Sequence, residues 1–304
     1  MKKNLLFNMT LILLFFTSTD ILFAGDDLKK FQKSFDTDQK IKLDLVLGGC
    51  TIVPSNDTKI HLLVEYNYDE SEFEVRITER IRSINIEEKL MNNPNGFSMW
   101  TLAVPKDAEI EFNSATGSLT VEKVDIELEA NSGTGSISVA NCQGDYELNS
   151  GTGSIEVTES KGEFELGSGT GKVEISDSKG NFEAGSGTGR VIADHVELLD
   201  EGEFNSGTGS VKIENVTGQN FDLNASSGTG TVTLIMKKSN LKGYFEFSTN
   251  VRYGKIKSPI EFDGTEIIDS EGGHDKQVRS WFQKGKDTPR YYIKTGTGSA
   301  VLEL

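Results

Sequence analysis

The sequence of 304 residues predicts an all-β fold, a single-stranded parallel β-helix, or β-solenoid, with about 18 residues in each coil. Three observations predict it. A Gly-rich hexapeptide returns at a fixed period, the segments between its copies alternate apolar and polar residues, and glycine recurs at the same places in each period. A period of roughly this length is typical of solenoids, in which each unit buries its apolar face only against the next one. Right-handed coiling is expected from the handedness of parallel crossovers.

The hexapeptide carries Ser or Thr second, Thr fourth and Gly fifth. From copy to copy the position number of the second residue rises by 18 four times in succession, then by 20, 21 and 68. The constant spacing of the hexapeptide indicates that the same corner forms once in each coil. A shift of the strand register by one residue would expose the core side chains to solvent. The second residues of the copies are Ser114, Ser132, Ser150, Ser168, Ser186, Ser206, Ser227 and Thr295.

Between these blocks the residues alternate with the period of a β-strand. Phe164 and Leu166 flank Glu165, for example. The alternating segments between the blocks are too short for a helix. We expect three short strands per coil, at 154–157, 163–166 and 168–170, with inward-facing Ser168 and Thr170. The predicted core comprises Ile137, Val139, Tyr146, Leu148, Ile155, Val157, Phe164, Leu166, Val173, Ile175 and Phe182.

Residues 1–24 are predicted to be a secretory signal peptide. Lys2 and Lys3 precede an apolar run over 11–16, and small residues approximate a cleavage site near residue 24. A transmembrane anchor is the alternative, but the apolar run is short and Asn8 and Asp20 interrupt the segment. No membrane span is expected in the mature chain, which we place in the periplasm, on the cell surface or outside the cell.

Residues 25–304 are predicted to form one solenoid domain. We expect an N-terminal cap with wider coils over 25–105, regular repeats over 106–256, an excursion over 257–290 and a final coil over 291–304. A solenoid exposes unpaired strand edges at its ends. We expect the excursion to cover the edge of the final coil, with Trp281 and Phe282 as anchors, and the protein to be a monomer. End-to-end association through that edge is the alternative.

The net charge bears on the partner of the protein, and the positions of the two cysteines bear on disulfide formation. A formal net charge of −16 argues against nucleic acid as a partner. Cys50 and Cys142 lie in distant coils, so free thiols are expected rather than a disulfide.

No catalytic, cofactor-binding or metal-binding residues are predicted. The three histidines, His61, His195 and His274, are widely separated, and no acidic, basic or nucleophilic cluster recurs with a catalytic spacing. We therefore expect a protein that is not an enzyme. A carbohydrate-active β-helix enzyme acting on extracellular polysaccharide is the alternative, because some parallel β-helices cleave acidic polysaccharides with clustered charged residues.

Two further columns of residues repeat along the solenoid. A threonine column would match a crystalline surface such as ice only if it faced outward, and the alternation predicts that it faces inward. Glu147, Glu165 and Glu183 recur with the period of the hexapeptide and form an acidic stripe. We expect this stripe to be solvated rather than to bind a cation or a basic partner. The threonine column is Thr134, Thr152, Thr170, Thr188 and Thr208.

The chain resembles the DUF4097 family of bacterial adhesin-like strand-repeat proteins, which are related in style to head GIN-domain proteins. The resemblance covers essentially the whole mature chain and rests on the 47–52 stretch LGGCTI, the 102–105 stretch LAVP and the Ser-Gly-Thr-Gly blocks. It implies a β-solenoid with no general catalytic residues. The expected role is a non-catalytic secreted or cell-envelope scaffold that presents repetitive faces to an envelope or extracellular partner, either protein or polysaccharide. Where the family usually has Asp after the second Gly, this chain has Ser136, Ser154, Lys172, Arg190 and Ser210.

Overall fold

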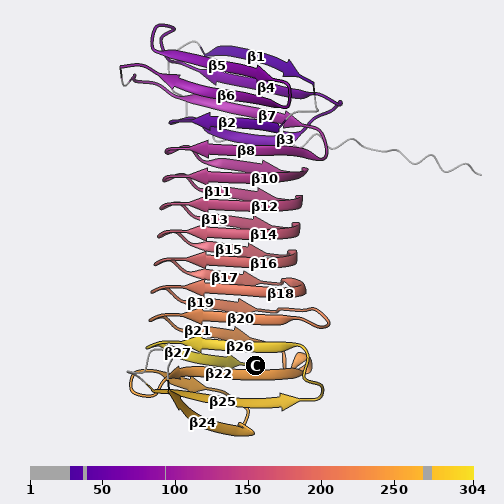
Figure 1. Ribbon diagram of the computed structural model, residues 1–304, viewed down its shortest axis with the longest axis vertical. Coiled ribbons are helices and arrows are strands. Elements are labelled where there is room, and N and C mark those ends of the chain that lie inside the picture. Colours follow the sequence, from indigo (N-terminus) through magenta and orange to yellow (C-terminus); the bar gives the residue numbers. More distant parts are fainter. Residues whose placement is uncertain (1–27, 37–39, 93, 270–275) are drawn as a thin grey trace, which may run out of the picture.

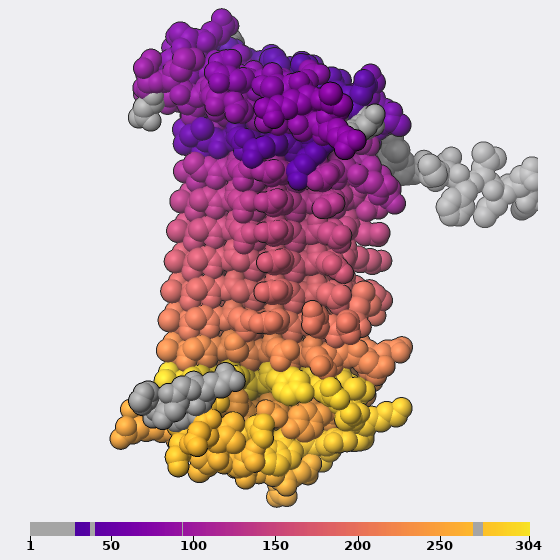
Figure 2. Space-filling model, viewed as in Figure 1, coloured from indigo at the N-terminus to yellow at the C-terminus, as the bar shows by residue number. Residues whose placement is uncertain are grey.

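The computed structural model describes residues 28–36, 40–92, 94–269 and 276–304 (Figure 1). The predicted signal peptide, 1–24, lies outside the described residues. The strands stack in two long sheets, A and B, and Figure 2 shows the middle coils as level layers between broader ends. This confirms the all-β solenoid, whereas its right-handedness stays a prediction.

Sheet A and sheet B each take about one strand from every coil. Sheet A has the order β1 (Lys29–Phe35), β4 (Ile60–Tyr66), β7 (Ser98–Val104), β3 (Gly49–Pro54), β9 (Leu119–Glu122), β11 (Ile137–Ala140), β13 (Ile155–Thr158), β15 (Val173–Ser176), β17 (Val191–Asp194), β19 (Val211–Glu214), β21 (Val232–Ile235), β27 (Ser299–Glu303), β23 (Lys255–Lys257). Sheet B has the order β24 (Gly264–Asp269), β25 (Lys276–Lys284), β22 (Gly243–Asn250), β26 (Arg290–Thr295), β20 (Asp222–Ser227), β18 (Glu197–Ser206), β16 (Lys179–Ser186), β14 (Lys161–Ser168), β12 (Gln143–Ser150), β10 (Asp125–Ser132), β8 (Ala108–Ser114), β2 (Lys40–Leu45), β6 (Ser83–Leu90), β5 (Phe73–Arg80). A short 3₁₀ helix, η1, spans Lys238–Asn240.

Each regular coil contains two strands, so the expectation of three strands per coil was wrong. A short strand in sheet A, such as β13, is followed by a long strand in sheet B, such as β14, which already ends at Ser168. Residues 169–172 then turn the chain back toward sheet A. Neighbouring coils pair in parallel with the repeat in register, as where Phe164 lies opposite Phe182.

Hydrogen bonds of the repeated serine make the Gly-Thr-Gly block a corner rather than a strand. Ser168 Oγ accepts a hydrogen bond from the Gly171 N–H at 2.8 Å and donates to the carbonyl oxygen of Gly153, one coil earlier, at 2.9 Å. Ser168 is buried as expected, but Thr170 is exposed, because the alternation of a strand ends where the chain turns. The threonine column therefore faces solvent, which corrects the inward placement.

We expect Ser168→Ala to lower the free energy of unfolding by about 1–2 kcal/mol, because it removes two hydrogen bonds and leaves the buried Gly153 carbonyl and Gly171 N–H without the serine. Urea unfolding of the purified protein measures this change. Thr170→Ala, at an exposed position of the same corner, is the matched control and should change stability by less than about 0.5 kcal/mol. Equal losses in the two variants would contradict the ladder of serine hydrogen bonds.

Every residue of the predicted core is buried. Glu165 is exposed between buried Phe164 and Leu166, which confirms the register. Tyr146, Phe164 and Phe182 stack along the solenoid axis with ring centroids 5.3 and 5.2 Å apart. Cys50 and Cys142 are free and buried, as expected, and burial raises the pKa of both thiols.

The coils at the two ends are not stacked in chain order. The coil β2–β3 lies between β6–β7 and β8–β9, and the final coil β26–β27 lies between β20–β21 and β22–β23. The excursion therefore does not cover the final coil, which corrects the predicted cap. Its strand β25, with buried Phe282 and half-buried Trp281, instead pairs antiparallel with β22, and β24 pairs antiparallel with β25.

Candidate functional site

Carboxylates line the outer face of sheet B in two columns. Alternation turns two acidic side chains outward on most of the long strands, and the parallel register places them beside those of the next coil, as in Glu147 opposite Glu165 and Glu165 opposite Glu183. On β16, Asn181 interrupts one of the two columns opposite Glu163. We call these residues the acidic face. One column is Glu109, Glu127, Asp145, Glu163 and Glu201, and the other is Glu111, Glu129, Glu147, Glu165, Glu183 and Glu203.

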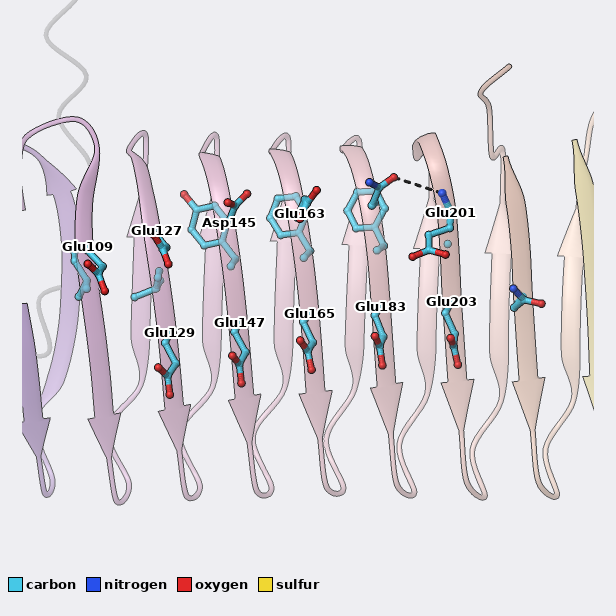
Figure 3. A pocket seen from close by; sticks show the side chains of 18 of the residues that line it. Glu109, Glu127, Glu129, Asp145, Glu147, Glu163, Glu165, Glu183, Glu201 and Glu203 are labelled. Carbon is cyan, nitrogen blue, oxygen red and sulfur yellow. Dashed lines mark hydrogen bonds between the residues drawn. The ribbon is translucent and has the colours of Figure 1, made fainter. Parts of the chain in front are cut away.

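The acidic face borders a shallow groove of about 440 Å³. Figure 3 shows its labelled carboxylates in two rows that cross successive strands, all on the same side of the sheet. Neighbouring strands are about 4.8 Å apart. Like charges at that spacing repel one another unless salt or a cationic partner screens them.

Lysines compensate the acidic face at its N-terminal end. Lys40 Nζ lies 2.8 Å from Glu109 Oε1, and Lys42 Nζ lies 2.5 Å from Glu111 Oε1. The hydrogen bond from Lys42 lowers the pKa of the Glu111 carboxyl, and the carboxylates raise the pKa of both lysines. Within the described ranges, no salt bridge involves the three carboxylates of the predicted stripe, Glu147, Glu165 and Glu183.

Asparagine at the first position of the hexapeptide orients some of these carboxylates. This contact was not predicted from the sequence. Asn131 Nδ2 donates to Glu129 Oε1 and Asn149 Nδ2 donates to Glu147 Oε1, both at 3.4 Å. The signal was present in the sequence, because Asn follows the outward Glu by two positions in several coils. In the coils of Glu165 and Glu183, that position is Gly167 or Gly185.

The histidines are not brought together. His61 lies at the N-terminal end, 2.9 Å from Asp57 Oδ1 and 2.8 Å from Ser34 Oγ. His195 lies at a corner beside Asp194. His274 lies outside the described residues. Among the residues that the structure describes, no group of three or more His, Cys, Asp or Glu side chains could hold a metal ion.

Neutralising the predicted stripe should stabilise the protein. We expect Glu147→Gln, Glu165→Gln and Glu183→Gln together to raise the free energy of unfolding by a few tenths of a kcal/mol per site at low salt, because each removes repulsion between neighbouring coils. The gain should shrink in about 1 M NaCl, where the Debye length is about 3 Å. Thermal unfolding at both salt concentrations measures it.

Glu174→Gln is the control for this effect, because Glu174 on sheet A already pairs with Lys172. It should give no gain at low salt. Millimolar calcium or magnesium should not stabilise the wild-type protein beyond the effect of equal ionic strength. A saturable stabilisation by either ion would contradict the solvated stripe.

The protein is thus a parallel β-solenoid with two long sheets, and two columns of carboxylates face solvent on sheet B. The family model of the Toastrack DUF4097 proteins matches residues 39–244. The chain belongs to this family. No curated protein matches it. Across the described residues, no helix is long and apolar enough to cross a membrane.

Three solved structures are similar over most of their lengths. A "putative adhesin" from Parabacteroides distasonis is 13% identical, with 92% of this chain and 98% of that chain covered and a TM-score of 0.38. A "putative lipid binding protein" from the same species is 12% identical, with 90% and 96% covered and a TM-score of 0.40. A "putative cell adhesion protein" from Clostridium sporogenes is 14% identical, with 91% and 99% covered and a TM-score of 0.24.

Proposed function

We propose that this protein is a non-catalytic, adhesin-like scaffold of the cell envelope that presents its acidic face to a positively charged partner. The observation that carries the proposal is the acidic face itself, in which outward carboxylates repeat in register over successive coils. The face is broader than the stripe of Glu147, Glu165 and Glu183 that the sequence predicts to be solvated, and the proposal takes up the basic partner that was the alternative there.

The rigidity of the solenoid supports a binding role. Each carboxylate stands on a strand that is hydrogen-bonded on both sides, so a partner meets a fixed array rather than flexible loops. A single sign of charge over an extended face also steers an oppositely charged partner and makes the association rate depend on salt.

A scaffold fits the face better than an enzyme does. The carboxylates of the acidic face repeat without a distinctive pair, and the described histidines lie away from it. Catalysis by general acid and base needs a few groups with different environments, not a uniform array. Export rests on the predicted signal peptide, 1–24. Turnover of uronic-acid polymers by the purified protein would overturn the non-catalytic assignment.

Binding to a polylysine-coated surface tests the acidic face. We expect the Glu147→Gln, Glu165→Gln, Glu183→Gln variant to bind more weakly than the wild type in low salt, and the difference to fade as salt rises. The matched control replaces Glu156, Glu174 and Glu214 on sheet A by Gln, which changes the net charge equally. Equal weakening in both variants would mean that net charge, not this face, governs binding.

A further inference from the structure

The outer face of sheet B changes character near the C-terminal end of the stack. The carboxylate column that ends at Glu203 continues in register through Asn224, Tyr292, Glu246 and Trp281. Aromatic and amide side chains thus replace a run of acids. This region lies on β20, β26, β22 and β25, beyond the coils that carry the acidic face.

The neighbouring column supplies basic and hydroxyl groups. From Asn205 it continues through Ser226, Lys294, Ser248 and Arg279. Apart from Trp281, the residues of the two columns border a groove of about 770 Å³, which we call the terminal groove. Its volume is within the roughly 300–1,000 Å³ typical of ligand pockets.

Several polar groups of the terminal groove have unused hydrogen-bonding capacity. Within the described part of the chain, the Tyr292 hydroxyl and the side chains of Asn224, Gln277 and Lys294 make no hydrogen bond to the protein. They offer donors and acceptors on one surface. In the acidic coils, by contrast, the side-chain amides of Asn131 and Asn149 already donate to glutamates.

Among the described residues, Tyr292 is the aromatic side chain that borders the terminal groove, and Tyr244 and Trp281 lie next to its lining residues. The rings of Tyr292 and Tyr244 lie 6.2 Å apart, and the indole of Trp281 covers Gly264, where an added Cβ would meet ring atoms at 2.2 Å. The Arg279 guanidinium lies 5.9 Å from the Trp281 ring centre and also pairs with Glu266. Tyr292 combines an apolar ring with a hydroxyl, which suits a ligand that has both apolar and hydroxyl faces.

The charges of the terminal groove nearly cancel. The carboxylates of Glu203, Glu246 and Asp269 border it together with the cationic side chains of Arg279 and Lys294. Mixed charges of this kind produce no strong field of one sign, unlike the carboxylates of the acidic face. The groove therefore favours a neutral ligand over a polyanion or a polycation.

We propose that the terminal groove binds a neutral oligosaccharide, stacking a sugar ring on Tyr292 and bonding its hydroxyls to Asn224, Gln277 and Lys294. A sugar ring has an apolar face for the aromatic side chain and hydroxyl groups for the polar ones. This site goes beyond the proposed function of the acidic face and does not depend on it.

Titration of the purified mature protein with cellohexaose, mannohexaose and xylohexaose tests the site. Trp281 fluorescence provides one readout, because the other tryptophan, Trp100, is buried, and calorimetry provides a second. We expect at least one neutral hexamer to bind with a Kd below about 1 mM. Tyr292→Ala should weaken that binding at least tenfold, an effect of about 1.4 kcal/mol. Hexagalacturonate is the anionic comparison.

Tyr253→Ala is the matched control, because Tyr253 is an exposed tyrosine at the same end of the molecule and outside the groove. It should bind like the wild type. Asn224→Ala, at an exposed position, provides a second test if Tyr292→Ala unfolds. Failure of all three neutral hexamers, equal losses in the Tyr292 and Tyr253 variants, or tighter binding of hexagalacturonate would overturn the proposal. The triple Gln variant of the acidic face should bind these sugars normally, which separates the two sites.

Discussion

Gly162→Ala is expected to lower the free energy of unfolding by roughly 3 kcal/mol or more. Gly162 has φ +142°, which side chains rarely adopt, and a Cβ there would lie 1.7 Å from the carbonyl oxygen of Gly144 in the preceding coil. That neighbour is backbone, so relief of the clash requires the two coils to separate. Because each coil is stabilised mainly by its neighbours, a local gap weakens the whole stack. Urea unfolding measures the loss.

Gly185→Ala is the matched control, since it makes the same change in the next coil. A Cβ at Gly185 would meet nothing within 4 Å. This variant should change stability by no more than about 0.5 kcal/mol. If both alanine variants are equally stable, close backbone approach is not what requires glycine at 162.

Glu88→Ala is expected to cost about 3–5 kcal/mol, because Glu88 is a buried carboxylate at the centre of a hydrogen-bond network. Its Oε2 accepts hydrogen bonds from the backbone N–H groups of Val46, Leu47 and Gly48 at 2.7, 2.8 and 3.0 Å. Its Oε1 accepts one from the Ser98 hydroxyl at 2.5 Å. Removing the carboxylate leaves these donors unsatisfied.

Glu88 takes over the role that serine has in the other coils. Leu45 lies opposite Ser114, so the β2–β3 coil has no serine to accept the corner N–H of Gly48. The carboxylate reaches across from the β6–β7 coil instead. Glu88→Gln keeps an acceptor oxygen for the backbone amides and should cost less than Glu88→Ala.

Glu87→Gln serves as the control, because Glu87 is the adjacent, partly exposed carboxylate with a lysine 3.0 Å away. It should cost less than about 1 kcal/mol. Chemical denaturation of all three variants gives the comparison. A Glu88→Ala protein as stable as Glu87→Gln would show that the corner amides find other partners, such as water.

The candidate site was predictable only where it repeats locally. The columns of Glu147, Glu165 and Glu183 follow from the period, because residues one period apart in a uniform solenoid lie side by side. The terminal groove has no such signal. Tyr292 lies beside Asn224, which is far earlier in the chain, only because the final coil inserts next to β20, and a single sequence contains no record of that insertion.

The sequence by itself determined the period, the register and the core, because burial of alternate side chains in identical stacked coils leaves one arrangement that keeps Phe164 inside and Glu165 outside. Only the tertiary structure decided where strands end and how the end coils are ordered. Alternation cannot show that Ser168 Oγ bonds the Gly171 N–H and turns the chain, which leaves Thr170 in solvent. The order of the end coils depends on which exposed strand edge the chain pairs with after a long connection. That pairing joins strands that are far apart in the sequence, so local sequence preferences do not determine it.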